Sequence, residues 1–224
     1  LVAVESSSAK HPVGGMFADG QTVELAAGAR LVLVGGTGRT VRLSGPYAGK
    51  PGEGAPKGDG RLVAALTTLV QRKPEESGSV GAVRAADVAW RFDAVREVAD
   101  VLAIDPTVGG EQCVASREPG QVKLVRSPLS AMAEASIMSL DSGTAGKAAW
   151  RQGAIATAWP GDVAIDDNHG YLVEMPNQSA VTQIIMRVLP ATAPSNAHWA
   201  VLMAEAGCEM QSRLMLAVIA RAAK

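Results

Sequence analysis

The sequence predicts a mostly β protein of the α+β class, and three observations lead to this prediction. Between residues 101 and 189, short β-type runs recur at about ten-residue spacing with Gly, Pro, Asn and Asp between them, as in a sandwich or open barrel. Residues 40–44 alternate in polarity after a turn with three glycines, which favours a β-hairpin over residues 30–44. The last thirty or so residues change to helical periodicity and predict a helical hairpin.

Composition places bounds on the class of protein. The chain has 224 residues, of which 47% are hydrophobic and 4% aromatic, with a formal net charge of −1. This is enough apolar material for a core, and the charge argues against an electrostatic nucleic-acid binder. No apolar run reaches 18 residues, so we expect no transmembrane segment. The chain begins at Leu1, which fits removal of a signal peptide or tag, or a sequence that starts part-way along its protein.

We expect a small β unit over residues 1–50. Strands are predicted at Val2–Glu5, Thr22–Leu25, 30–34 and 39–44. Gly35, Gly36 and Gly38 resemble the turn of a dinucleotide-binding enzyme, but that turn must open a helix. Here strand-like alternation follows and Gly45-Pro46 interrupts the chain, so a hairpin is favoured over nucleotide binding.

The rest of the chain divides into three expected parts. Residues 51–82 are a Pro/Gly-rich linker with a helix at about 60–73, and residues 83–190 form an antiparallel sandwich-like domain, with 84–99 open between helix and strand. Residues 191–224 form the helical hairpin, with Ser195 as cap, Gly207 as stop and an apolar stripe on the second helix. The stripe comprises Met210, Leu214, Ala217 and Val218. The runs predicted as strands in 83–190 are Val101–Asp105, Gln112–Ala115, Val122–Arg126, Glu134–Leu140, Gly153–Ala158, Gly170–Met175 and Val181–Leu189.

Two cysteines, Cys113 and Cys208, make a candidate disulfide, with two buried free thiols as the alternative. The bond would close a loop of about 95 residues and stabilise the fold by up to ~4–5 kcal/mol in the chain-entropy model. It would also attach the helical hairpin to the β domain. No cysteine or histidine spacing matches a zinc site.

Candidate chemical groups are few, and we predict no catalytic, cofactor or metal residues. His169 beside Asp166 and Asp167 could bind a metal or transfer protons, but turn chemistry explains it better. The carboxylates Asp93, Glu97 and Asp100 fit a solvated helix face. Trp90, Trp159 and Trp199 are candidate interface residues, while at least two of the four tryptophans, the fourth being Trp150, are expected in the core.

The N-terminal segments 19–25, 27–33 and 38–46 resemble a FecR-type periplasmic domain, which pairs a short strand and Gly turn with a hairpin ending in Gly-Pro. The whole chain is also similar to exported proteins of Gram-negative bacteria, alphaproteobacteria in particular. The segments that carry this likeness are Gly81–Arg84, Gln112–Val114, Trp159-Pro160 and Gly207–Gln211. The resemblance implies a periplasmic or secreted location and a non-catalytic role in the cell envelope. The cytoplasmic and membrane segments of a FecR signal transducer have no counterpart here.

These observations lead to one functional expectation and two alternatives. We expect a binding or scaffold protein with protein partners in the bacterial envelope, a subunit of a larger assembly. The first alternative is a nucleotide-dependent enzyme that uses the turn Gly35–Arg39. The second is a sensor domain that binds a polysaccharide or small ligand in an exposed tryptophan cleft.

Overall fold

The computed structural model describes residues 1–51, 60–71, 95, 97–126, 134–175 and 181–222. The chain forms two compact units. Unit 1 comprises residues 1–78, 193–204 and 215–224, and unit 2 comprises residues 79–192 and 205–214. The fold is mostly β with a pair of helices at the C-terminus, as the sequence predicts.

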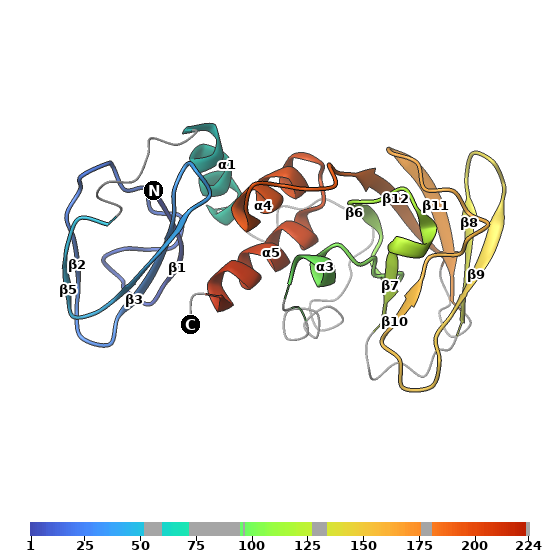
Figure 1. Cartoon of the computed structure of the whole chain (residues 1–224), viewed down its shortest axis with the longest axis horizontal. Helices are drawn as coiled ribbons and strands as arrows, with labels where there is room; N and C mark the ends of the chain where they lie inside the picture. Colours follow the sequence, from blue (N-terminus) through green and yellow to red (C-terminus); the bar gives the residue numbers. More distant parts are fainter. Residues whose placement is uncertain (52–59, 72–94, 96, 127–133, 176–180, 223–224) are drawn as a thin grey trace. The chain divides into compact units, whose positions relative to one another are not determined.

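Unit 1 contains two small antiparallel sheets (Figure 1). The first has the order β1-β3-β4, formed by Val2–Ser6, Arg30–Val34 and Thr40–Ser44. The second pairs β2 (Val23–Leu25) with β5 (Tyr47–Gly49). The β3–β4 hairpin confirms the prediction for residues 30–44. β5 was missed, because a three-residue strand beside prolines and glycines has too little alternation to detect.

Alternation along β3 and β4 builds the core of unit 1. Leu31, Leu33 and Leu43 share one face of the sheet, and period-2 geometry sends them to the same side. They join four other buried side chains, namely Ala3, Phe17, Val23 and Leu25. The helix α1 (Gly60–Gln71) contacts β1 and buries Leu62, Leu66 and Leu69, which confirms the helix expected at about 60–73 over its described part.

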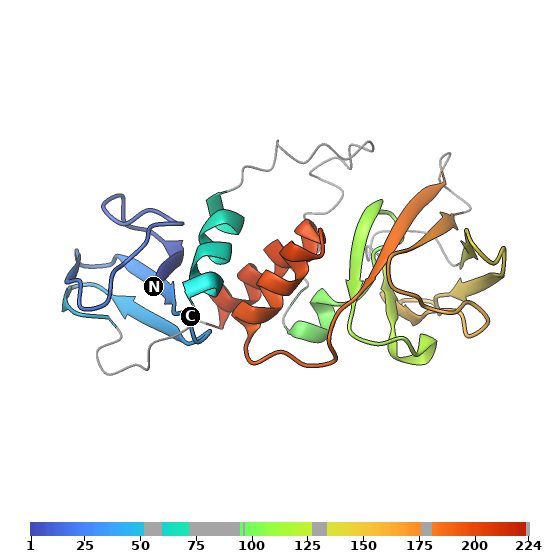
Figure 2. The ribbon, with the colours of Figure 1, turned by 90° about the horizontal axis from the view of Figure 1, so that it is seen from above.

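The C-terminal helices are α4 (Asn196–Glu205) and α5 (Glu209–Arg221), which form the predicted hairpin (Figure 2). Gly207 lies between them with a φ of 82°, the left-handed conformation that favours glycine at a helix end. The predicted stripe on α5 is wrong in part, since Met210 and Ala217 are only half-buried. The buried positions are Gln211, Ser212, Leu214, Met215, Val218 and Ile219.

Unit 2 is built around a five-stranded sheet with the order β6-β12-β11-β8-β9 (Figure 1). Its strands are Gly110–Val114, Thr182–Val188, His169–Glu174, Glu134–Ser139 and Ala145–Ala149, in the same order. A separate ribbon pairs β10 (Ala156–Ala158) with β7 (Lys123–Val125). Because β6 runs parallel to β12, the expected all-antiparallel sandwich is corrected to a mixed sheet.

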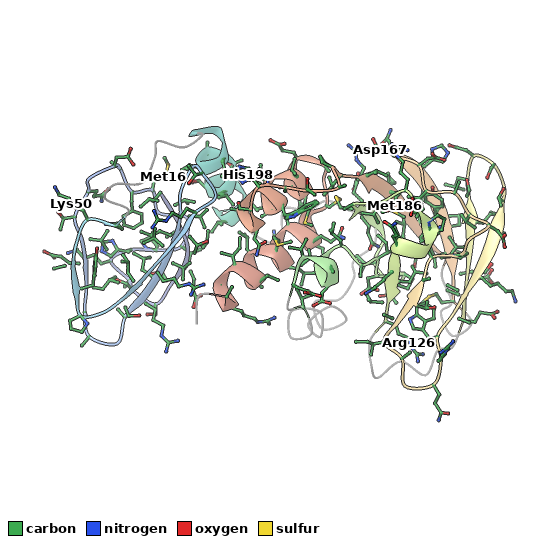
Figure 3. All side chains as sticks on the ribbon, viewed as in Figure 1. Met16, Lys50, Arg126, Asp167, Met186 and His198 are labelled. Carbon is green, nitrogen blue, oxygen red and sulfur yellow. A yellow bond between two sulfur atoms is a disulfide. The ribbon has the colours of Figure 1, made fainter. Side chains whose placement is uncertain are left out.

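The core of unit 2 joins one face of this sheet to the ribbon. Tyr171, Ile137 and Ile184 from the sheet are fully buried together with Leu124 from the ribbon. Met186, labelled in Figure 3, is also fully buried in this cluster. An edge-on aromatic contact joins Trp159 and Tyr171, with ring centroids 5.2 Å apart.

Two predictions in unit 2 need correction. The run Val101–Asp105 is not a strand: the helix α3 (Val98–Val101) ends there, and Ile104 forms only an isolated bridge with Leu124. The strand β9 was missed because its sequence, AGKAA, lacks the β-branched and aromatic residues that indicate strands. The undecided segment 84–99 is helical from Val98, and its residues 84–94 lie outside the described part of the chain.

The residues of the C-terminal helices are divided between the two units. Residues 193–204 and 215–224 belong to unit 1, and residues 205–214 belong to unit 2. The N-terminal β strands and α1 belong to the same unit. The chain therefore leaves unit 1 and returns to it after the β region.

Candidate functional site

The glycine turn of unit 1 contacts the start of helix α4. Gly35 N–H donates to the carbonyl of Arg39 (2.9 Å) and Gly38 N–H donates to that of Gly35 (2.8 Å), as a tight hairpin turn requires. Gly38 has a φ of 73°, and a Cβ there would overlap the Ser195 hydroxyl and lie 2.8 Å from His198 Nδ1. The turn therefore packs against the start of α4, which occupies the space beside Gly38.

Ser195 and His198 form a contact that the sequence did not predict. The Ser195 Oγ and His198 Nδ1 atoms lie 2.8 Å apart, and the backbone N–H of His198 donates to the same hydroxyl oxygen (3.3 Å). A hydroxyl beside an imidazole is an arrangement used in nucleophilic catalysis. Here the hydroxyl caps a helix and contacts Gly38, so the geometry is that of an N-cap (Figure 3 labels His198).

The Asp166–His169 segment is held as a turn. The Asp167 carboxylate accepts a hydrogen bond from the backbone N–H of Val188 (2.8 Å), and Asn168 accepts one from Arg187 (2.8 Å). Asn168 has a φ of 59°, as an Asx residue in a tight turn tolerates. Asp167 is labelled in Figure 3. The side chains of Asp167 and Asn168 thus fix the loop before β11.

His169 pairs with a carboxylate from another hairpin. Its Nε2 contacts Asp141, which follows β8, while Asp166 forms an ion pair with Arg117 at 3.6 Å. Asp166 and His169 are therefore directed to different partners. Within the described part of the chain, no three His, Cys, Asp or Glu side chains come close enough to hold a metal ion.

The disulfide Cys113–Cys208 is formed, and both cysteines are fully buried. It joins β6 to the residue that precedes α5. The pairing that the sequence left open against two free thiols is therefore present. Both cysteines belong to unit 2, and they are 95 residues apart in the sequence.

Gln211 forms a second connection one turn along α5 from Cys208. Its Oε1 accepts the N–H of Cys113 (2.6 Å), while its Nε2 donates to the carbonyls of Cys113 and Val101 (both 2.8 Å). Gln211 is 3% exposed. Sequence analysis gave it no role, because a polar residue in an amphipathic helix ordinarily faces solvent. The available signal was its position three residues after a cysteine, on the same helical face.

The carboxylates Glu97 and Asp100 form a capping box around the start of α3, with the Glu97 N–H donating to Asp100 (3.2 Å). This places them in a structural role at the helix end. Asp93, the third member of the predicted row, lies outside the described residues.

The tryptophans fill the interior. Trp150, Trp159 and Trp199 are 5%, 2% and 6% exposed, which confirms that at least two of the four are core residues. Their burial leaves almost no side-chain surface of Trp159 and Trp199 for a partner or a ligand cleft. Trp90 lies outside the described residues.

One small cavity, of about 210 Å³, lies beside α3 in unit 2. Its wall is mainly aliphatic, and its polar members are Ser116, Gln121 and Lys123. Cavities that hold a drug-sized ligand start at about 300 Å³. The wall contains no carboxylate or imidazole, and its ionisable side chain is that of Lys123.

Comparison of the chain with protein-family models, curated proteins and solved structures finds no match. The resemblance to FecR-type domains therefore rests on the sequence motifs alone. Among the helices of the described residues, none is long and apolar enough to cross a membrane.

Proposed function

We propose that this chain is a non-catalytic binding or scaffold protein of the bacterial envelope, exported to an oxidising compartment. The observation that carries the proposal is the Cys113–Cys208 disulfide. Disulfides with buried sulfurs form and persist in periplasmic and secreted proteins and are rare in the cytosol. The disulfide helps to hold α5 against β6. In a compartment where the thiols stay reduced, this contact would lack the bond and would be weaker.

The polar clusters support a role in binding rather than catalysis. The pairs Ser195–His198 and Glu97–Asp100 cap helices, and the Asp166–His169 segment fixes a turn. Each of these groups already has a structural partner. A catalytic site needs a nucleophile, base or acid directed toward space that a substrate can occupy.

The FecR-like domain is part of the same proposal. It is supported by the order of β2, a glycine turn at Gly28 and the hairpin β3–β4, followed by Gly45-Pro46. These are the elements that the resemblance implies for residues 1–50. A FecR-type domain in this position fits a protein that meets its partners outside the cytoplasm.

Export is tested by the thiol state of the protein in its own host. Cells are treated with an alkylating reagent before lysis, the protein of the periplasmic or secreted fraction is denatured in the same reagent so that buried thiols also react, and its mass is measured with and without reduction. We expect no alkylation before reduction and two alkylated cysteines after it. Two alkylated cysteines without reduction, in protein from the cytoplasmic fraction, would contradict export.

The binding role is tested by crosslinking in the same cells. A short-range crosslinker is expected to convert part of the protein into discrete species of higher mass, and reduction of Cys113–Cys208 before crosslinking should diminish them. A protein that stays monomeric under all conditions would contradict a scaffold role, even if its disulfide is formed.

A further inference from the structure

The strand β4 is an edge of its sheet, with a row of backbone groups that have no partner. The hairpin bonds Gly35 N–H to Arg39 O and Gly45 N–H to Ala29 O fix the register at both ends. Because hydrogen-bonded pairs alternate in an antiparallel ladder, Val41 and Leu43 face β3, and the backbone groups of alternate residues face away. Those residues are Thr40, Arg42 and Ser44. Within the described chain, no hydrogen bond from another segment covers these three residues.

The segment that carries this edge is basic. Residues 25–52 contain four cationic side chains and no acidic one. The four are Arg30, Arg39, Arg42 and Lys50, all exposed, and none forms an ion pair with another described residue. Figure 3 labels Lys50, which follows β5. The nearby acid Glu24 is already paired with Lys10 at 2.9 Å.

Two of the arginines share one face of the hairpin. Arg30 lies opposite Ser44 and Arg42 opposite Val32, so the two side chains are diagonal neighbours on the same side of the sheet. On the other face, Leu43 is buried and Val41 packs against the core. At the turn, Gly38 contacts the start of α4, whose first turn has no acidic residue and carries partial positive charge.

We propose that the edge of β4 binds an extended acidic peptide segment of a partner protein by strand addition. The proposal rests on the binding role proposed above and names its surface and partner class. Free N–H and C=O groups along an edge supply main-chain hydrogen bonds to an added strand. Acidic side chains at alternate positions of that strand would meet Arg30 and Arg42, and β-branched side chains between them would extend the apolar face. The alternative explanation is that the arginines only prevent the edge strand from pairing with another copy of the chain.

The test uses the full-length, disulfide-bonded protein and a fluorescent ten-residue peptide in which Glu and Val alternate. We expect saturable binding at micromolar peptide concentrations, measured by anisotropy. Replacement of every Glu by Lys should weaken binding at least tenfold. Methylation of every second backbone nitrogen should weaken binding at least tenfold for the set that faces β4 and have little effect for the other set, because only alternate N–H groups of an added strand reach the edge.

Variants of the protein then test whether the peptide binds at β4. Arg30→Glu and Arg42→Glu should each weaken binding of the Glu-Val peptide at least tenfold. The same substitutions should strengthen binding of the peptide in which every Glu is replaced by Lys. The matched control is Arg151→Glu, which changes an exposed arginine in unit 2 and should leave both affinities unchanged. These substitutions lie on the surface, and the methylated peptides probe the backbone without any change to the protein.

Several outcomes would overturn the proposal. Equal loss for the two methylated sets, or for neither, rules out strand addition. If a soluble polyuronate displaces the Glu peptide as effectively as unlabelled Glu peptide does, the patch is a general anion site. Growth in particle size without peptide assigns the edge to a second copy of the chain. If the peptide does not bind while crosslinked species are still found in cells, only the assignment of the binding surface to β4 is wrong. If those species are absent as well, the binding role itself fails.

Discussion

Gln211 pairs with Cys113 as the backbone of a neighbouring strand would. The single carboxamide accepts from the N–H and donates to the C=O of the same β6 residue, at 2.6 and 2.8 Å. The outer edge of the mixed sheet is thereby closed by a helix side chain instead of a sixth strand. The disulfide joins the same residue of β6 to Cys208, so one position of the strand carries a covalent and a polar connection to the chain around α5.

Replacement of Gln211 by Leu should destabilise unit 2 strongly. The substitution leaves the N–H of Cys113 and the carbonyls of Cys113 and Val101 buried without partners, and one such orphaned group costs about 1–3 kcal/mol. We expect a loss of about 3–5 kcal/mol in the free energy of unfolding, measured by denaturant titration. Gln152→Leu, at an exposed position, is the control and should change stability by less than about 0.5 kcal/mol. A Gln211→Leu protein as stable as this control would contradict the pairing.

Removal of the disulfide should cost about 4–5 kcal/mol, since it closes a loop of 95 residues. The double variant Cys113→Ala/Cys208→Ala, unfolded in denaturant, measures this loss without a reductant. Because Gln211 contacts the same strand residue, its substitution in the cysteine-free background should cost less than in the native protein. Strict additivity of the two losses would show that the two connections act independently.

Replacement of three glycines by alanine, one at a time, separates two causes of lost stability, namely backbone strain and steric overlap. Gly161→Ala meets nothing within 4 Å at an ordinary φ and should change stability by less than about 0.5 kcal/mol. Gly28→Ala forces a left-handed alanine into open space and should cost about 1–2 kcal/mol. Gly38→Ala adds overlap with Ser195 and should cost about 3 kcal/mol or more. Thermal unfolding gives the order, and equal losses at Gly28 and Gly38 would refute the contact between the turn and α4.

The stability of unit 2 should fall at high pH because of Tyr171. Burial raises the pKa of its hydroxyl, which donates to the Ala164 carbonyl (2.8 Å) and accepts the Asp166 N–H (3.0 Å). A raised pKa means that the folded state holds the proton more tightly, so this contribution is present below about pH 10 and is lost as the pH rises through the folded-state pKa. Tyr171→Phe should be less stable at pH 8 and lose less stability between pH 8 and 11, as measured by urea titration. Parallel curves for the two proteins would contradict this assignment.

Local patterns predicted the elements whose causes are local. The β3–β4 hairpin follows from alternation and turn glycines, and the α4–α5 break follows from Gly207. Prediction failed where distant contacts decide the structure. The strand β9 has glycine at position 146, because a side chain there would meet Pro160 and Val163. Gln211 is polar yet buried, because its partner lies 98 residues away in β6.

The parallel pairing of β6 with β12 has a consequence for biosynthesis. Synthesis completes β6 about 70 residues before β12 begins, and Gln211 and Cys208 follow later still. Every nascent chain therefore passes through a stage in which β6 lacks both its partner strand β12 and its contacts with Cys208 and Gln211. Such unpaired strands are prone to aggregate. A ribosome-bound chain would therefore need protection of this strand, as a chaperone provides, until β12 and α5 have emerged. The folded protein gives no sign of this need, because the strand is then paired.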